Sequence, residues 1–314
     1  MALFPKKVES FLGLNAAVAG VSAFGKHPCY ADHLPLDLGD QSQLAARLRQ
    51  TFYNGGIIAR VGDWENLEKA DKAIPFGHYV LYRDKDGAAL LRLWPSSDSV
   101  QRSDIPLVLA AVASGVSVDW LIANASGVLA DAEPRCKAAR TLEELRAVVQ
   151  SADEELRKRA AAAKKEAGEP LSSRLAELSP AETASLIAAL RPLWEYVPLD
   201  GDARAELPDR AATSRSAAWA TPQLEGLSRW SALIDAALAG RKSRYFLIAP
   251  DQTGGNGGWI DLIVGEPGHR QFTCLRAGSA AIPPAAAKSD ELTDDFGVKA
   301  LAWLRKLSGG KLAV

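Results

Sequence analysis

Cysteine is scarce in this chain of 314 residues, and its use limits the class of protein. The three cysteines, Cys29, Cys136 and Cys274, are far apart and odd in number. This argues against a disulfide framework and favours a reducing, cytoplasmic environment. The four histidines do not combine with a cysteine at the spacing of a zinc site, so no metal or other cofactor is expected.

An excess of charge of either sign is also lacking. The formal net charge is −1, and no basic stripe with interleaved aromatic residues is present, which argues against a nucleic-acid partner. No polybasic patch indicates an anionic membrane, and no apolar run reaches transmembrane length.

The N-terminal segment leaves export open as the alternative to the cytoplasm. Lys6 and Lys7 precede an apolar run that ends in Val21-Ser22-Ala23, which has the form of a signal cleavage site. Asn15 interrupts that run, and Val18–Phe24 has the β-branched and aromatic content of a first strand. We therefore interpret Val18–Phe24 as the first strand of the folded domain, with residues 1–17 as an extension before it.

The centre of the chain predicts three strands in succession. Phe76–Tyr82 and Ala89–Trp94 are apolar runs separated by the turn-forming sequence Asp84–Gly87, in which Gly87 is expected to adopt a positive φ. The polar loop Pro95–Arg102 follows, and then Ile105–Val112, a nearly continuous apolar run typical of a strand buried on both faces.

Helices are expected on either side of this centre. Asp40 should cap a helix with Leu44, Leu48 and Phe52 on one face, ended by a left-handed cap at Asn54-Gly55-Gly56. Capping boxes that begin at Thr141 and Ser179 predict two further helices.

The second half of the chain is expected to be helical first and then to return to strands. The segment Asp200–Ser216 is charged and poor in large apolar residues, which predicts a mobile loop. A helix should begin at Thr221 and end at Gly240. Three strands and a last helix capped by Thr293 follow; the strands are Arg244–Ala249, Trp259–Val264 and Gln271–Leu275.

The order of these elements predicts an α/β fold with a central, mostly antiparallel sheet, flanking helices and an inserted helical block. The predicted organisation is an N-terminal extension over 1–17, an α/β core over 18–118, a helical insertion over 119–243, and strands and a helix over 244–314 that complete the core. A split into two domains near residue 120 is the alternative.

Several polar clusters invite a catalytic or metal-binding interpretation, and each has a simpler one. The glycine-rich segment 251–258 lacks the Gly-Lys-Ser/Thr ending of a phosphate loop and precedes a strand, so a hairpin turn suffices. His27, Asp32 and His33 could be metal ligands, but they share one loop and no second cluster completes a site. Cys29 near a histidine could be a nucleophile, but no orienting third group stands at a recognisable spacing. Ser96, Ser97 and Asp98 are not in a nucleophile elbow. The sequence therefore predicts a non-catalytic protein, with no catalytic residue assigned.

Two polar loops carry a resemblance to a known family. Gly25, Lys26 and Pro28, followed by Asp32 and His33, resemble the first signature of the TagF (ImpM) family of type VI secretion accessory proteins. The loop from Pro95 through Ser96, Ser97, Asp98 and Arg102 to Pro106 is similar to the second signature of that family. His33 stands where the family has an aromatic residue, and Gln101 replaces the glycine before the arginine. The chain is thus similar to a divergent, enlarged member.

The resemblance implies a longin-like α/β core and a cytoplasmic, non-catalytic role in assembly or control of type VI secretion through protein contacts. It implies a protein partner, with a forkhead-associated scaffold as one candidate. The alternative function is that of a small-ligand-binding protein or enzyme with a pocket between the loops 25–35 and 95–102.

The sequence also makes a geometric prediction about these loops. Each follows a strand, so both are expected at one edge of the sheet if the strands run in the same direction. Arg102 should then bind Asp98, Asp32 or both, with Lys26 as a second cation.

Overall fold

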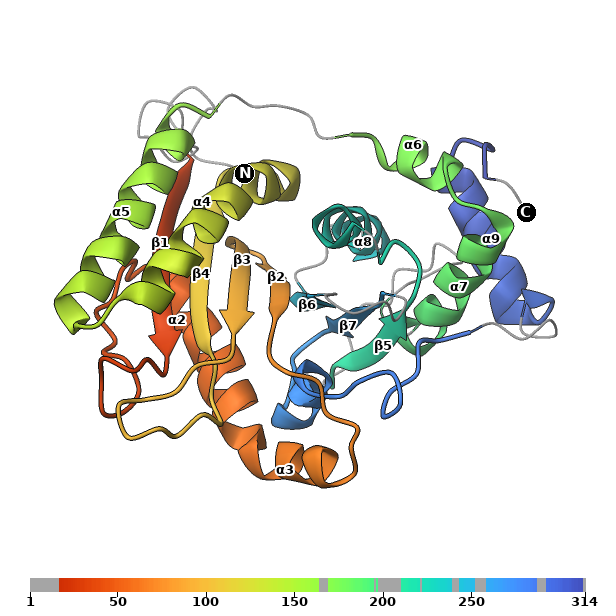
Figure 1. Cartoon of the computed structure of the whole chain (residues 1–314). Helices are drawn as coiled ribbons and strands as arrows, with labels where there is room; N and C mark the ends of the chain where they lie inside the picture. Colours follow the sequence, from red (N-terminus) through yellow and green to blue (C-terminus); the bar gives the residue numbers. More distant parts are fainter. Residues whose placement is uncertain are drawn as a thin grey trace.

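One sheet organises the part of the chain that the structure describes. The computed structural model describes residues 17–163, 169–194, 196, 210–220, 222–238, 243–251, 258–286 and 292–312. In these residues a seven-stranded sheet has helices on both of its faces (Figure 1), which confirms the predicted α/β class. Residues 1–16 of the predicted N-terminal extension, Thr221, Gly240 and most of the glycine-rich turn lie outside the described residues.

All neighbouring strands of the sheet are antiparallel, in the order β1-β4-β3-β2-β6-β7-β5. Strand β6 pairs with β2, and β7 pairs with β6, so the late strands complete the sheet begun by the central hairpin, as predicted. The strands are β1 Val18–Gly25, β2 His78–Asp84, β3 Gly87–Trp94, β4 Leu107–Ser114, β5 Ala212–Ser216, β6 Tyr245–Pro250 and β7 Ile260–Val264.

Helices cover the two faces of the sheet unequally. One face carries α4 Val118–Ala138, α5 Leu142–Ala161 and α8 Gln223–Leu238, with α7 Pro180–Leu190 beside β5 (Figure 1). The other face carries α2 and the irregular helices η1 and η4. The remaining helical bounds are α2 Gln43–Leu48, η1 Arg49–Ile57, η2 Ile58–Arg60, α3 Val61–Lys69, α6 Leu171–Ala176, η3 Arg191–Leu193, η4 His269–Leu275 and α9 Asp295–Leu307.

The alternation of side chains along β3 divides the hydrophobic core into two. Leu90 belongs to the cluster under α4, α5 and α8, whereas its neighbour Leu91 belongs to the cluster under α2 and η1. Successive residues of a strand point to opposite faces, so the continuous apolar sequence of β3 is what a strand covered on both sides requires. The described residues of the range 119–243 thus cover one face of the sheet with helices, and they also contribute the edge strand β5.

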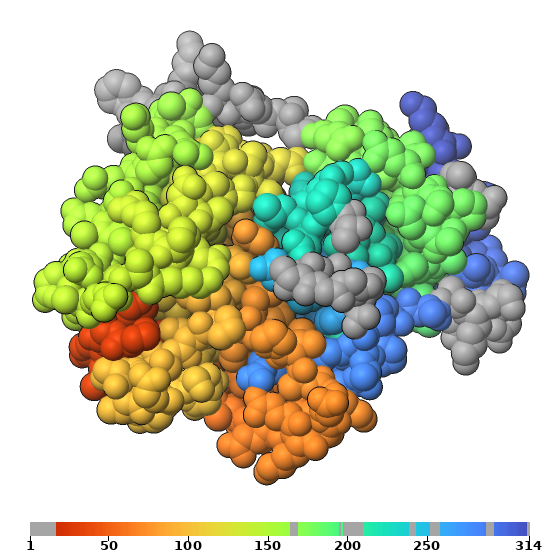
Figure 2. Space-filling model, viewed as in Figure 1, coloured from red at the N-terminus to blue at the C-terminus, as the bar shows by residue number. Residues whose placement is uncertain are grey.

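Segments far apart in the sequence meet on the second face. The ring of Phe272 in η4 packs edge-on against Phe52 in η1, with ring centroids 5.3 Å apart. At the surface too, late residues (blue) lie against early residues (orange) (Figure 2). The C-terminal residues therefore complete the core of the domain.

Two predicted elements are wrong for reasons of packing. Asn54-Gly55-Gly56 does not end a helix, because these residues lie within η1 and the chain continues helically into α3. A Cβ on Gly56 would stand 2.6 Å from the ring of Phe272, so this glycine permits a close approach of η1 to η4. Gln271–Leu275 is part of the 3₁₀ helix η4, in which Phe272 and Leu275, three residues apart, are both buried.

The predicted mobile loop over Asp200–Ser216 is also wrong at its described end, where Ala212–Ser216 forms the edge strand β5. Strand β5 is polar because it carries Arg215. This side chain is buried against Asp261 of β7, with Nε and Oδ1 2.6 Å apart. The rest of that loop up to residue 209 lies outside the described residues.

Three local details also differ from expectation. The first helix is capped by Ser42 rather than Asp40, and the last by Asp294 rather than Thr293. Gly87 does not adopt a positive φ, but a Cβ there would stand 2.4 Å from the carbonyl oxygen of Ala113. The lack of a side chain at Gly87 therefore permits the close approach of β3 to β4.

Candidate functional site

The two signature loops meet at one edge of the sheet. Strands β1 and β3 both pair antiparallel with β4, so they run in the same direction and end at the same edge. The loop after Gly25 and the loop after Trp94 emerge there. The backbone N–H of Ser99 in the second loop donates to the carbonyl of Tyr30 in the first, at 2.9 Å. The predicted juxtaposition is confirmed.

Gly25 and Pro106 interlock the two signatures through the backbone. Gly25 has φ +120°, and a Cβ on it would stand 2.1 Å from the carbonyl oxygen of Pro106. Both the conformation and the contact exclude a side chain. The N–H of Lys26 then donates to that same carbonyl of Pro106, at 3.4 Å.

Lys26 is the buried cation of the site. Its side chain is 4% exposed, although lysine is among the residues that proteins bury least. The ammonium group lies 3.4 Å from Asp98 and 2.9 Å from Asp104, so it joins the first loop to the second loop and to the residues that follow it. A charge this deeply buried needs such partners to be tolerated.

Asp98 organises the second loop around its own carboxylate. One oxygen accepts the backbone N–H groups of Val100 and Arg102, and the other accepts Nε of Arg102 at 2.6 Å. Burial opposes ionisation of the carboxyl, but these hydrogen bonds and the Lys26 ammonium outweigh it and lower its pKa to about 2. Asp98 is therefore ionised and fully buried at neutral pH.

Arg102 closes the site from the solvent side. Besides its bond to Asp98, it donates from Nη2 to the carbonyl of Ala31, at 2.8 Å. Nη2 also lies 3.7 Å from the carboxylate of Asp32. The prediction that Arg102 binds Asp98 and approaches Asp32 is confirmed. Its side chain is 53% exposed, so Lys26 is the more buried of the two cations.

Gln101 stands at a position of the second loop where the backbone conformation favours glycine. Its φ is +68°, in the left-handed region. Glycine adopts this conformation without a steric cost, whereas a residue with a Cβ is strained there. Gln101 is therefore a strained position of the loop.

Asp32 and His33 do not form a metal site with His27. Nδ1 of His33 is hydrogen-bonded to the hydroxyl of Tyr53, whereas Nε2 of His27 faces the carbonyl of Cys136 at 2.8 Å. The two imidazoles therefore have different hydrogen-bond partners. Across the described residues, no group of three histidine, cysteine or acidic side chains is arranged to hold a metal ion.

His27 and Cys29 form the pair that the sequence suggested as a possible nucleophile. Nδ1 of His27 lies 2.9 Å from Sγ of Cys29, and the Cys136 carbonyl, which can only accept, fixes the hydrogen on Nε2. Burial raises the pKa of the Cys29 thiol and lowers the pKa of the His27 imidazole. Both shifts favour the neutral pair over a thiolate and imidazolium.

A pocket of about 440 Å³ borders the signature loops. Pro28, Pro95, Ser96 and Ser97 line it, together with the imidazole of His27. Asp32, His33 and Asp98 are not among its lining residues, so the pocket lies beside the ion-pair cluster and not within it.

A second pocket adjoins the first, and the sequence reasoning missed it. The two pockets share Trp94, Pro95 and Lys137. The available signal was Arg92, a charged residue within the apolar run of β3. A charge on a buried strand requires partners, and these come from distant parts of the chain.

No protein-family model and no curated protein matches this chain. The described helices include none that is long and apolar enough to span a bilayer.

Proposed function

We propose that the protein is a non-catalytic cytoplasmic adaptor or regulator that acts through protein contacts in the assembly or control of type VI secretion. One observation carries the proposal: the two loops that resemble the TagF (ImpM) signatures are locked together into one fixed surface. Lys26, Asp98 and Gly25 hold that surface from within, which leaves the exposed residues of the loops to meet a partner. A longin-like core and a forkhead-associated partner are what the resemblance implies for this chain.

The exposed part of the surface has the mixed character of a docking site. Val100 is 60% exposed at the tip of the second loop, beside the half-exposed guanidinium of Arg102. Asp32 of the first loop is exposed next to it. An apolar side chain rimmed by charges suits a protein partner better than a substrate.

The test is affinity purification of the tagged full chain from native cells, followed by mass spectrometry. Val100→Glu places a charge at the centre of the proposed surface. Val298→Glu in α9 is the matched control, because Val298 is 56% exposed and lies on a different element. We expect the wild type and the control to recover a type VI secretion component that Val100→Glu loses. Recovery of none by the wild type, or equal recovery by Val100→Glu, contradicts the proposal.

The pocket of about 440 Å³ beside the loops favours a small-ligand-binding function as the second candidate. Its volume lies in the range of ligand sites, and Ser96 and Ser97 supply hydroxyl groups to its wall. Native mass spectrometry of the protein purified from its own cells tests this function. A bound small molecule that Ser97→Trp removes supports it, and an unliganded wild-type mass contradicts it.

A further inference from the structure

The carboxylate of Asp32 lies exposed on the surface that the two signature loops form. The side chain is 67% exposed, so an incoming group can reach it. Nη2 of Arg102 lies 3.7 Å from its Oδ1 and Nε2 of His33 lies 3.8 Å from it, and both distances exceed that of a hydrogen bond. Among the described residues, no donor forms a hydrogen bond with this carboxylate.

The balance of charge at this edge of the sheet shows why that matters. Five charged side chains meet there: Lys26, Arg102, Asp32, Asp98 and Asp104. Two of them are cations and three are carboxylates, so one negative charge is left over. Asp98 binds both cations, and Asp104 binds Lys26. The excess charge therefore resides on Asp32.

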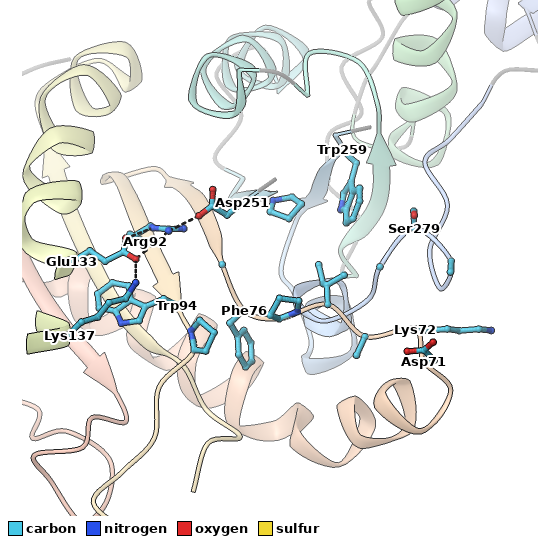
Figure 3. A pocket seen from close by; sticks show the side chains of 18 residues that line it. Asp71, Lys72, Phe76, Arg92, Trp94, Glu133, Lys137, Asp251, Trp259 and Ser279 are labelled. Atoms are coloured by element: carbon cyan, nitrogen blue, oxygen red, sulfur yellow. Dashed lines mark hydrogen bonds and ion pairs between the residues drawn. The ribbon is translucent and has the colours of Figure 1, made fainter. Parts of the chain in front are cut away.

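The pocket at the end of β3, beside these loops, has charges that are compensated within the protein. Nε of Arg92 donates to Glu133 and Nη2 donates to Asp251, both at 2.7 Å (Figure 3). Lys137 also binds Glu133. A partner that brings a positive charge therefore gains more at Asp32 than at the paired carboxylates of this pocket.

The backbone on both sides of Asp32 is held in place. The carbonyl of Ala31 accepts Nη2 of Arg102 at 2.8 Å. On the other side, His33 pairs with Lys26 in an isolated antiparallel bridge. A side chain on an ordered backbone binds a partner at a smaller cost in conformational entropy than one on a flexible loop.

The two oxygens of Asp32 differ in their surroundings. Arg102 and His33 both approach Oδ1, which leaves Oδ2 for a partner. A single oxygen suits the compact ammonium group of a lysine, whereas the planar fork of an arginine binds both oxygens of a carboxylate at once.

An apolar side chain lies near this carboxylate. Val100 is 60% exposed, and the N–H of its neighbour Ser99 donates to the carbonyl of Tyr30, two residues before Asp32. We propose that the partner is a protein whose contact surface presents a lysine next to an apolar side chain. The ammonium group binds Oδ2 of Asp32, and the apolar side chain packs on Val100. The inference rests on the proposed function, because it specifies the partner of that surface.

Zero-length crosslinking with a carbodiimide tests this contact, because the reagent joins a carboxylate directly to an amine that touches it. The tagged full chain is treated in a lysate of native cells and purified, and its crosslinked peptides are identified by mass spectrometry. We expect an amide bond between Asp32 and a lysine of the component that the wild type recovers. Absence of such a crosslink from the wild type overturns the inference.

Asp37 provides the matched control. It lies in the same loop and is also 67% exposed, but it is paired with Arg146 at 3.1 Å. Asp32→Asn should remove the crosslink, and Asp37→Asn should leave it in place. A crosslink that persists in Asp32→Asn, or that is lost only in Asp37→Asn, assigns the contact to another carboxylate and overturns the inference.

Reversal of the charge measures what the contact contributes. Asp32→Lys should reduce recovery of the partner at least about tenfold, because like charges repel across an interface. Asp37→Lys should reduce it by less than about twofold. Equal recovery by Asp32→Lys overturns the inference but leaves the proposed function standing, whereas recovery of no protein by the wild type overturns both. A crosslink from Asp32 to a lysine of a protein outside type VI secretion supports the inference and contradicts the proposed function.

Discussion

The ammonium group of Lys26 lies 3.4 Å from the carboxylate of Asp98, and both side chains are almost completely buried. These residues belong to different loops, so their contact joins two strand ends that are separated by β4 in the sheet. This pair is therefore the structural centre of the site.

Removal of Lys26 should cost more stability than removal of Arg102. Lys26→Met leaves a buried carboxylate with one cation fewer, and should lower the free energy of unfolding by about 3 kcal/mol. Arg102→Ala removes a half-exposed partner and should cost only about 1 kcal/mol. Urea denaturation of both variants measures the difference. A larger loss for Arg102→Ala contradicts the ranking.

Gln101→Gly should stabilise the protein. The left-handed backbone at this position is strained for glutamine and free for glycine, so the free energy of unfolding should rise by about 1 kcal/mol. Gln101→Ala is the control, because alanine keeps the Cβ and should bring no gain. Thermal denaturation compares the two, and equal midpoints for Gly and Ala would count against the conformational explanation.

Gly25→Ala should have the opposite effect. The added Cβ would meet the Pro106 carbonyl in a backbone conformation that alanine avoids, and the free energy of unfolding should fall by at least about 2 kcal/mol. Gly127→Ala in the middle of α4 is the control, since nothing lies within 4 Å of a Cβ there. That change should instead raise stability by up to about 1 kcal/mol. Destabilisation by both changes would mean that the loop contact is not the cause.

The pH dependence of stability should show the effect of the buried imidazole of His78. Burial, reinforced by Arg92, Arg215 and Arg276, lowers its pKa to about 3, and its Nδ1 accepts the N–H of Gly77. The folded pKa lies below the unfolded value, so the unfolded state binds more protons and stability falls as the pH drops below about 6.5.

His78→Asn keeps an acceptor near the Nδ1 position and removes the titration. Between about pH 6 and pH 4 the wild type should lose about 1 kcal/mol more per pH unit than this variant. Urea denaturation across that range gives both curves. Parallel curves would show that His78 does not titrate as described.

Local patterns in the sequence were sufficient to predict most strands of the sheet. The run Ala89–Trp94 and the turn at Asp84–Gly87 carry their own strand and hairpin signals, and they form β3 and its connection to β2. The two loops could be placed at one edge because each follows a strand, and Arg102 could be paired with Asp98 because they are four residues apart.

Features that depend on distant contacts could not be predicted in this way. Strand β5 is polar, and it is held in the sheet by the buried pair of Arg215 with Asp261 of β7. Gly56 resembles a helix terminator in the sequence, but in the structure it makes room for the ring of Phe272. The pocket at Arg92 depends on Glu133 and Asp251, which no local pattern connects to β3.

A double-mutant cycle on Lys26 and Asp98 tests the central claim most directly. The free energies of unfolding of Lys26→Met, Asp98→Asn and the double variant are compared with that of the wild type. If the pair joins the loops, Lys26→Met in the Asp98→Asn background should cost less than about a third of what it costs in the wild type, because its partner charge is already gone. Equal costs in the two backgrounds would show that the two residues act independently and that this contact does not lock the loops together.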